Sequence, residues 1–341
     1  MEQEQLKKAA KKQIFKVSTA TSLTVIAIII LTNVIFLGIA AIMGDSYADF
    51  TANILDEMSF SLIIQDIIMI LGLFVYCKIM KVNLKAHFGK PQMKKSEIFS
   101  LIIIATGLGQ MVSVITNLIM TLVTMATDFE IGSVSFVAER NLFSTIFISL
   151  AIAIFAPVLE ELFFRASFFT PLVPHGRVFA IVVTAILFGL YHMNVPQIPA
   201  AIVWGFFFGY ISLESRSIIP AILGHIFNNS FGAIQYAFIG NLDLDRIAEG
   251  DMEYTMANLG SFIPVAIVSF CIYGIMFAAI ILVIIRLAKR GKDAFRITGA
   301  REENTILTKG EAFAAYFINP ATIILMLMVI GMTIFTVIGG R

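Results

Sequence analysis

Residues 18–43 read STATSLTVIAIIILTNVIFLGIAAIM, a run of 26 residues without a single charged side chain. A helix needs about 20 consecutive apolar residues to cross the hydrocarbon core of a bilayer. The run therefore predicts a membrane-spanning helix. It lacks a clear small-residue cleavage site, so we expect it to stay in place as an anchor and not to be removed as a signal peptide.

The same pattern repeats along the chain, in which only 14% of the residues are charged. Soluble domains carry about a quarter, so the deficit favours a lipid environment. The further apolar runs lie at 59–80, 98–126, 141–164, 178–193, 198–213, 217–238, 261–285 and 312–338. The runs at 178–193 and 198–213 are short, and we expect two helices joined by a tight turn at Pro196 and Pro199. The predicted fold class is an all-α, polytopic transmembrane bundle of about eight to nine spans.

The distribution of Lys and Arg predicts the orientation, because positively charged loops stay in the cytoplasm. A nine-span arrangement with a cytoplasmic N-terminus places 21 of the 24 basic residues on one side, the exceptions being Arg140, Arg246 and Arg341. We therefore expect a multi-pass protein of the cell membrane, with the lipid bilayer as its first partner.

Three regions follow from where polar residues interrupt the spans: an N-terminal three-span region at 1–140, a core at 141–240 and C-terminal spans at 241–341. The two cysteines, Cys77 and Cys271, have no metal-ligand spacing and offer no disulfide framework. A net charge of +1 gives no indication of nucleic-acid binding. The oligomeric state is not written in the sequence.

The fourth span carries two adjacent carboxylates in the stretch Ala156-Pro-Val-Leu-Glu160-Glu161-Leu-Phe-Phe-Arg165. Charged groups inside a membrane are costly and often functional. Glu161 and Arg165 are four residues apart and share a helix face. We expect Arg165 to neutralise Glu161, which leaves Glu160 to face another partner; a helix end whose charges reach the interface is the bland alternative.

Two later spans each place a histidine on one face with another residue of interest. Phe188 and His192 are four residues apart, and so are His225 and Asn229. Alone, each pair is as well explained by an interfacial residue or by hydrogen bonds that join helices. The concentration of ionisable and amide groups on three spans favours a functional cluster.

Such a cluster suits hydrolysis, although it leaves the chemistry open. A carboxylate and an imidazole can take a proton from water, while a second imidazole and an amide can donate hydrogen bonds to an oxyanion. Glu160, His192 and His225 could equally bind a zinc ion. The sequence lacks the His-Glu-x-x-His and Gly-x-Ser-x-Gly motifs of other hydrolases.

The ordered motifs Glu160-Glu161-x-x-x-Arg165, Phe188-x-x-x-His192 and His225-x-x-x-Asn229 resemble the signature of the CAAX-protease and bacteriocin-processing (CPBP, or Abi) family, which includes the type II CAAX prenyl endopeptidases. The resemblance covers about 150–235. It implies an intramembrane endopeptidase in which Glu160 and His192 activate water, His225 and Asn229 form the oxyanion hole, and Glu161 and Arg165 support them. Its substrate would be a membrane-associated peptide or protein. The resemblance favours no cofactor, with zinc as the alternative.

Two other functions compete with a protease: a non-catalytic membrane scaffold or bacteriocin-immunity protein, and a proton-coupled transporter. The depth of the motifs is a further question. Glu160 and His192 each lie 16 residues from Gly176, so a hairpin turning there would place them at one depth. His225 lies only nine residues after Arg216. We therefore expect the fourth helix to project beyond the membrane or to break near Pro171 and Pro174.

Overall fold

The computed structural model describes residues 1–47, 50, 57–127, 142–239, 242–243, 246–247, 249–299 and 305–339. Within this part of the chain the structure contains helices, turns and loops but no strand. The all-helical prediction is therefore confirmed. Arg140, Arg341 and the boundary expected at 140–141 lie outside the described residues.

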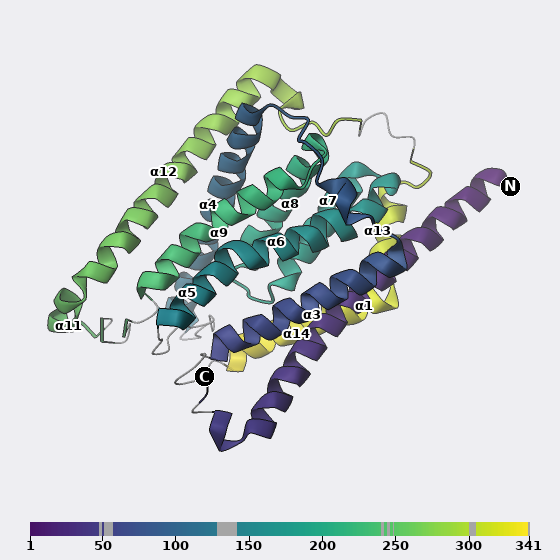
Figure 1. Cartoon of the computed structure of the whole chain (residues 1–341). Coiled ribbons are helices and arrows are strands. Elements are labelled where there is room, and N and C mark those ends of the chain that lie inside the picture. The colour runs from purple at the N-terminus through teal and green to yellow at the C-terminus, as the bar shows by residue number, and fades with distance from the viewer. Residues whose placement is uncertain are drawn as a thin grey trace.

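The helices fall into three groups, of which the middle one carries the predicted motifs (Figure 1). On one side α1 (Glu2–Met43) packs against α3 (Glu57–Met80), α13 (Lys309–Phe317) and α14 (Pro320–Gly339). On the other side α4 (Lys95–Thr127) packs against α12 (Leu259–Arg290), which follows the short α11 (Met252–Ala257). Between these two groups lie α5 to α9.

The middle group begins with one long, irregular helix from Leu142 to His175. It consists of α5 (Leu142–Leu150), a π-helical segment (Ala151–Phe155), α6 (Ala156–Glu161), a second π-helical segment (Leu162–Phe168) and a 3₁₀ segment (Thr170–His175). Then follow α7 (Arg177–Tyr191), α8 (Ile198–Ser215) and α9 (Ile219–Ile239). Gly176 has a φ of 134°, which L side chains rarely adopt, and it makes the turn into α7.

Among the residues that the structure describes, six helices are long and apolar enough to cross a membrane, or up to seven if the bent pair α13–α14 forms one span. The count of eight to nine spans is therefore not confirmed. With 15 residues, α7 is only about 22 Å long and is too short for a hydrocarbon core of about 30 Å. The apolar run at 178–193 did not by itself show that α7 is shorter than a helix that crosses a membrane.

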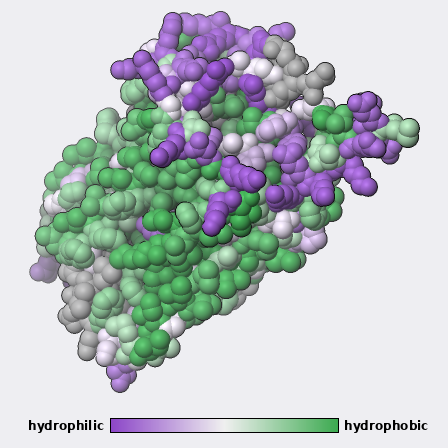
Figure 2. Space-filling view, turned by 45° about the vertical axis from the view of Figure 1, so that its right-hand side comes forward, coloured by the Kyte–Doolittle hydropathy of each residue, from purple (hydrophilic) through white to green (hydrophobic). Residues whose placement is uncertain are grey.

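Hydrophilic side chains gather at one end of the molecule, above a broad hydrophobic band (Figure 2). We call this the basic end, because it contains the lysine-rich start of α1 and the segments 78–95 and 286–299. Hydrophobic side chains on α1, α3, α4 and α12 are exposed over the band, as expected of surfaces that face lipid.

The structure resolves the question of depth at the turn between α8 and α9. The backbone of Gln92 donates a hydrogen bond to Ser215 O, and Ile218 N donates to His87 O. Residues 87–92 therefore cover this turn, in which Ser215 and Ile218 are buried. Because α9 begins beneath that cover, His225 reaches the depth of Glu160 within its first two turns. The helix before α7 also changes to 3₁₀ geometry at Pro171 and Pro174, where we expected a break.

Candidate active site

Glu161 and Arg165 form the buried ion pair that their spacing predicts. Arg165 Nε lies 3.2 Å from Glu161 Oε2, and both side chains are almost fully buried. The guanidinium also lies 4.4 Å from the ring centroid of Phe188 and 3.5 Å from Gly205 O. A buried charge is tolerated only when its partners are in place, so this pair anchors the α6 segment against α7 and α8.

His225 connects the two glutamates. Its Nδ1 donates a hydrogen bond to Glu161 Oε1 at 2.9 Å, and its Nε2 lies 3.7 Å from Glu160 Oε2. The imidazole stacks on the ring of Phe208 at a centroid distance of 5.2 Å. Since Nδ1 carries a proton, a neutral His225 would turn an acceptor towards the Glu160 carboxylate. The ring of His225 thus lies between the two carboxylates.

His192 caps the C-terminus of α7, and its backbone carbonyl partner defines its tautomer. Nδ1 lies 2.8 Å from Phe188 O, and a carbonyl can only accept, so Nδ1 donates. In the neutral ring Nε2 is then an acceptor. Phe188 joins the two histidines, because its ring contacts His192 at 4.9 Å and His225 at 5.6 Å between centroids.

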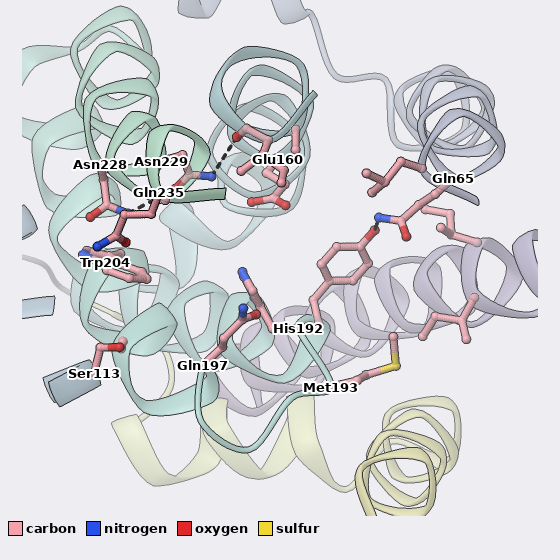
Figure 3. Close-up of a pocket in the computed structure, with 18 of the residues that line it drawn as sticks. Gln65, Ser113, Glu160, His192, Met193, Gln197, Trp204, Asn228, Asn229 and Gln235 are labelled. Atoms are coloured by element: carbon pink, nitrogen blue, oxygen red, sulfur yellow. Dashed lines mark hydrogen bonds between the residues drawn. The ribbon is translucent and has the colours of Figure 1, made fainter. Parts of the chain in front are cut away.

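Glu160, His192 and Asn229 line one cavity of about 580 Å³ in the middle group of helices (Figure 3). The cavity extends from α1 and α3 on one side to α4 and α12 on the other. His225 is not among the residues that line it and lies behind Glu160. The structure thus gathers all four predicted catalytic residues, three on the cavity wall and one in contact with the carboxylate at that wall.

The side chain of Asn229 is positioned by the π-helical segment Ala151–Phe155 of a neighbouring helix. The π-helical segment directs Ala156 N to Ala151 O, and Pro157 has no N–H to offer Ile152. The carbonyl of Ile152 therefore lacks a helical donor, and Asn229 Nδ2 donates to it at 3.1 Å. Segments of this π type occur frequently at functional sites.

Two further amides, Asn228 and Gln110, extend a chain of hydrogen bonds from Asn229. No role was predicted for either of them from the sequence. Asn228 Nδ2 donates to Asn229 Oδ1 at 3.1 Å, and Gln110 Nε2 donates to Asn228 Oδ1 at 3.3 Å. Gln110 is a polar residue within the apolar run at 98–126, but only the structure shows that α4 faces α9 there. Trp204 also lines the cavity, where its indole packs so closely on Gly109 that a Cβ at that position would overlap it.

The zinc alternative requires Glu160, His192 and His225 to act as ligands of one ion. Within the described ranges no group of three or more His, Cys, Asp or Glu side chains is placed so that it could hold a metal ion. The residues as arranged do not fit a zinc centre, and we derive no chemical step through a metal.

Comparison with known protein families gives a match to part of the chain. Residues 142–231 match the family model of type II CAAX prenyl endopeptidase Rce1-like proteins. This places the segment in the CAAX-type protease family. The CAAX-type segment contains the motif residues from Glu160 to Asn229. The family match and the long apolar helices together indicate a multi-pass membrane protein. No curated protein and no solved structure matches the chain.

Proposed function

We propose that the protein is an intramembrane endopeptidase that hydrolyses peptide bonds of membrane-associated peptides or proteins with a water molecule activated by Glu160. The observation that carries this proposal is the placement of Glu160 and His192 on one cavity wall. The match of residues 142–231 to a prenyl endopeptidase family supports the reaction class. The wider assignment to the CPBP, or Abi, group is part of the same proposal.

The groups around Glu160 can balance the charge of its carboxylate. With a proton on each ring nitrogen, His225 would lie between the carboxylates of Glu160 and Glu161, and Arg165 would supply a second positive charge. Two carboxylates and two cations then balance, which reduces the cost of burying them. Glu160 remains a proton acceptor at the surface of the cavity.

In the proposed reaction Glu160 takes a proton from water, and His192 Nε2 accepts a hydrogen bond that orients the same water. The resulting hydroxide attacks the carbonyl carbon of the peptide bond. An N–H of Asn229 that the Ile152 carbonyl does not use stabilises the oxyanion. Glu160 then delivers its proton to the leaving nitrogen as the C–N bond breaks. The oxyanion role predicted for His225 stays a prediction, since its Nε2 faces Glu160 in the structure.

The proposal is tested by incubating the purified full-length protein in vesicles with peptide pools and with solubilised membrane proteins, followed by mass spectrometry of the new termini. We expect products that the Glu160→Gln variant does not form. Proteolytic activity that persists in the presence of a chelator supports the glutamate mechanism. Activity that is lost with the chelator and recovered with zinc supports the zinc-dependent mechanism. A properly inserted wild-type protein that yields no Glu160-dependent product contradicts the protease and favours a scaffold or immunity protein.

We also propose that the basic end faces the cytoplasm of a cell whose plasma membrane holds the protein. Lys and Arg concentrate at this end, and such segments are retained in the cytoplasm. A reporter inserted at 251–258 should lie outside the cell, and one inserted at 291–299 should lie inside. Cytoplasmic signal from both insertions contradicts this orientation.

A further inference from the structure

A second cavity lies at the basic end, where the start of α1 and the end of α3 lie side by side (Figure 1). Its volume is about 440 Å³. It is lined by residues within 13–17 of α1, by residues within 80–87 after α3, and by Thr170 and Pro171 of the helix that carries Glu160. Among the described residues, none lines both this cavity and the one at Glu160. A ligand here would contact three distant segments of the chain without entering the proposed active site.

The charged side chains of this basic pocket are all positive. Lys16 and Lys81 line it, and its lining includes no Asp or Glu in the described part of the chain. Elsewhere on α1, Lys7 and Lys11 pair with Glu311 at 3.3 and 3.2 Å. Neither pocket lysine has such a partner among the described residues. The C-terminal end of α3 contributes a partial negative charge of about half a unit, which two lysines exceed. The pocket is therefore suited to an anion, and lysine commonly binds phosphate.

The backbone at Lys81 supports a role for its side chain. Val82 N donates to Cys77 O at 3.0 Å, and Lys81 has a φ of 56°. Together they form the Schellman turn that ends α3, in which glycine is the usual residue with a positive φ. A side chain in that conformation is unfavourable unless the surrounding structure compensates for it, and such positions cluster at ligand sites. Here the side chain lines the basic pocket.

His87 and Thr170 form a wall of the pocket that hydrogen bonds hold in place. Thr170 Oγ1 donates to Ala166 O at 2.7 Å, which uses its single O–H, so it accepts from His87 Nε2 at 3.3 Å. The backbone carbonyl of His87 accepts from Ile218 N at the start of α9. Burial lowers the pKa of His87, so the two lysines supply the positive charge at neutral pH. The wall thus connects the pocket to α9 and to the helix that carries Glu160.

The depth of the pocket indicates where its anion comes from. The first apolar run begins at residue 18, and the second ends at residue 80. Lys16 lies two residues outside the first run, about 3 Å along the helix, and Lys81 directly follows the second. Lipid headgroups occupy this zone at the edge of the hydrocarbon core. Basic pockets between membrane helices on the cytoplasmic side bind such headgroups.

We propose that the basic pocket formed by Lys16, Lys81, His87 and Thr170 binds the phosphate group of an anionic membrane lipid, with the two lysines as its charged ligands. The site is independent of the proposed protease reaction and of its outcome. A bound headgroup would join α1, the end of α3 and the helix that carries Glu160. Occupancy should therefore stabilise the folded protein, because the lipid binds only the assembled pocket.

The test measures which lipids the purified full-length protein retains. The protein is released from vesicles of phosphatidylcholine that contain a minor share of phosphatidylglycerol, and native mass spectrometry identifies the bound lipid. We expect phosphatidylglycerol to be enriched on the protein above its share in the vesicle, and the thermal midpoint to be higher than in pure phosphatidylcholine. Retention of the two lipids in the proportion of the vesicle contradicts the proposal.

Matched lysine variants separate a site from general attraction to an anionic surface. Lys16→Gln and Lys81→Gln remove a charge from the pocket, whereas Lys12→Gln and Lys85→Gln remove an exposed charge of the same two segments outside it. Each pocket variant should bind phosphatidylglycerol about fivefold more weakly than its control, the usual effect of one basic residue beside anionic lipid. Equal losses in all four variants would show attraction to the surface alone and overturn the proposal.

Lys81→Gly distinguishes loss of the ligand from damage to the fold. Glycine adopts a positive φ without strain, so the thermal midpoint in pure phosphatidylcholine should not fall. The affinity for phosphatidylglycerol should fall as far as in Lys81→Gln. A Lys81→Gly protein that retains phosphatidylglycerol like the wild-type protein contradicts the assignment of this side chain.

Inorganic phosphate and glycerol phosphate distinguish a lipid headgroup from a free phosphate. Each is added at constant ionic strength to the protein in phosphatidylcholine vesicles, and the thermal midpoint is measured. We expect both to raise the midpoint far less than phosphatidylglycerol does, because acyl chains hold the lipid phosphate at the depth of the pocket. An equal rise with inorganic phosphate that Lys16→Gln abolishes would assign the pocket to a soluble phosphate and overturn the lipid proposal.

Discussion

Two regions of this molecule bury polar groups between helices, and they differ in how fully those groups are hydrogen-bonded. The first is the seam, by which we mean Ser18 and Ser22 of α1 together with Tyr316, Asn319 and Thr322 of the α13–α14 region. The second is the cavity wall with Glu160, His192 and Asn229. The comparison shows what separates polar groups that join helices from polar groups that remain for chemistry.

In the seam the serine, threonine and asparagine side chains are hydrogen-bonded to one another or to the backbone, whereas the buried hydroxyl of Tyr316 has no partner in the described part of the chain. Thr322 Oγ1 lies 2.5 Å from Ser18 Oγ and 2.9 Å from Ser22 Oγ. Asn319 donates to Phe15 O and Thr19 Oγ1 and accepts from Ala321 N. Its amide uses both N–H donors and the carbonyl. Asn229 donates one such bond, to Ile152 O, and faces a cavity. Complete pairing is typical of structure, and incomplete pairing at a cavity is what a ligand site requires.

The largest change in stability should follow from breaking the ion pair behind the cavity wall. Glu161→Gln leaves the Arg165 guanidinium without its carboxylate, which costs about 3–5 kcal/mol in a buried pair. Thermal unfolding in detergent and protein abundance measure this loss. The double variant Glu161→Leu, Arg165→Met removes both charges and should recover more stability than either single change. A double variant that is less stable than both would contradict the pairing.

A smaller loss is expected at Asn229, because it satisfies a carbonyl that Pro157 leaves without a donor. Asn229→Leu deprives Ile152 O and Asn228 Nδ2 of their partners, at a cost of about 1–3 kcal/mol, and should also reduce proteolysis. The matched control is Asn117→Leu, because the exposed Asn117 only donates to Ser113 O in its own helix. Equal losses in the two variants would show that Asn229 has no special position.

The smallest effect should come from the seam itself. Thr322→Val removes the hydroxyl shared by Ser18 and Ser22, and such interhelical bonds in membranes contribute about 0.6 kcal/mol on average, and up to about 1.7 kcal/mol. Unfolding should occur at a slightly lower temperature, while the activity per folded molecule stays at the wild-type value. Loss of activity without loss of stability would remove the distinction between the two regions.

The sequence predicted those features that depend on local spacing. The pairing of Glu161 with Arg165 follows from the helix repeat, and the turn at Gly176 lies where a hairpin would bring Glu160 and His192 to one depth. The span count was not confirmed, because hydropathy cannot distinguish a short helix such as α7 from one that crosses the membrane.

Contacts between distant helices could not be predicted in the same way. The bond from Gln110 to Asn228 joins α4 to α9, and the bond from Asn229 to Ile152 depends on a π-helical segment. The placement of His225 behind Glu160 depends on residues 87–92, which cover the start of α9. None of these relations leaves a periodic signal in the sequence.

The central claim is that Glu160 acts on substrate, while its neighbour Glu161 maintains the structure. The most direct measurement is kcat/KM of Glu160→Gln together with its thermal midpoint and its abundance in the membrane. We expect kcat/KM to fall by about 10²–10⁴-fold, the usual contribution of a general base, while the midpoint and abundance match the wild-type protein. A Glu160→Gln variant that keeps its activity, or that loses abundance while Glu161→Gln is stable and inactive, would contradict the claim.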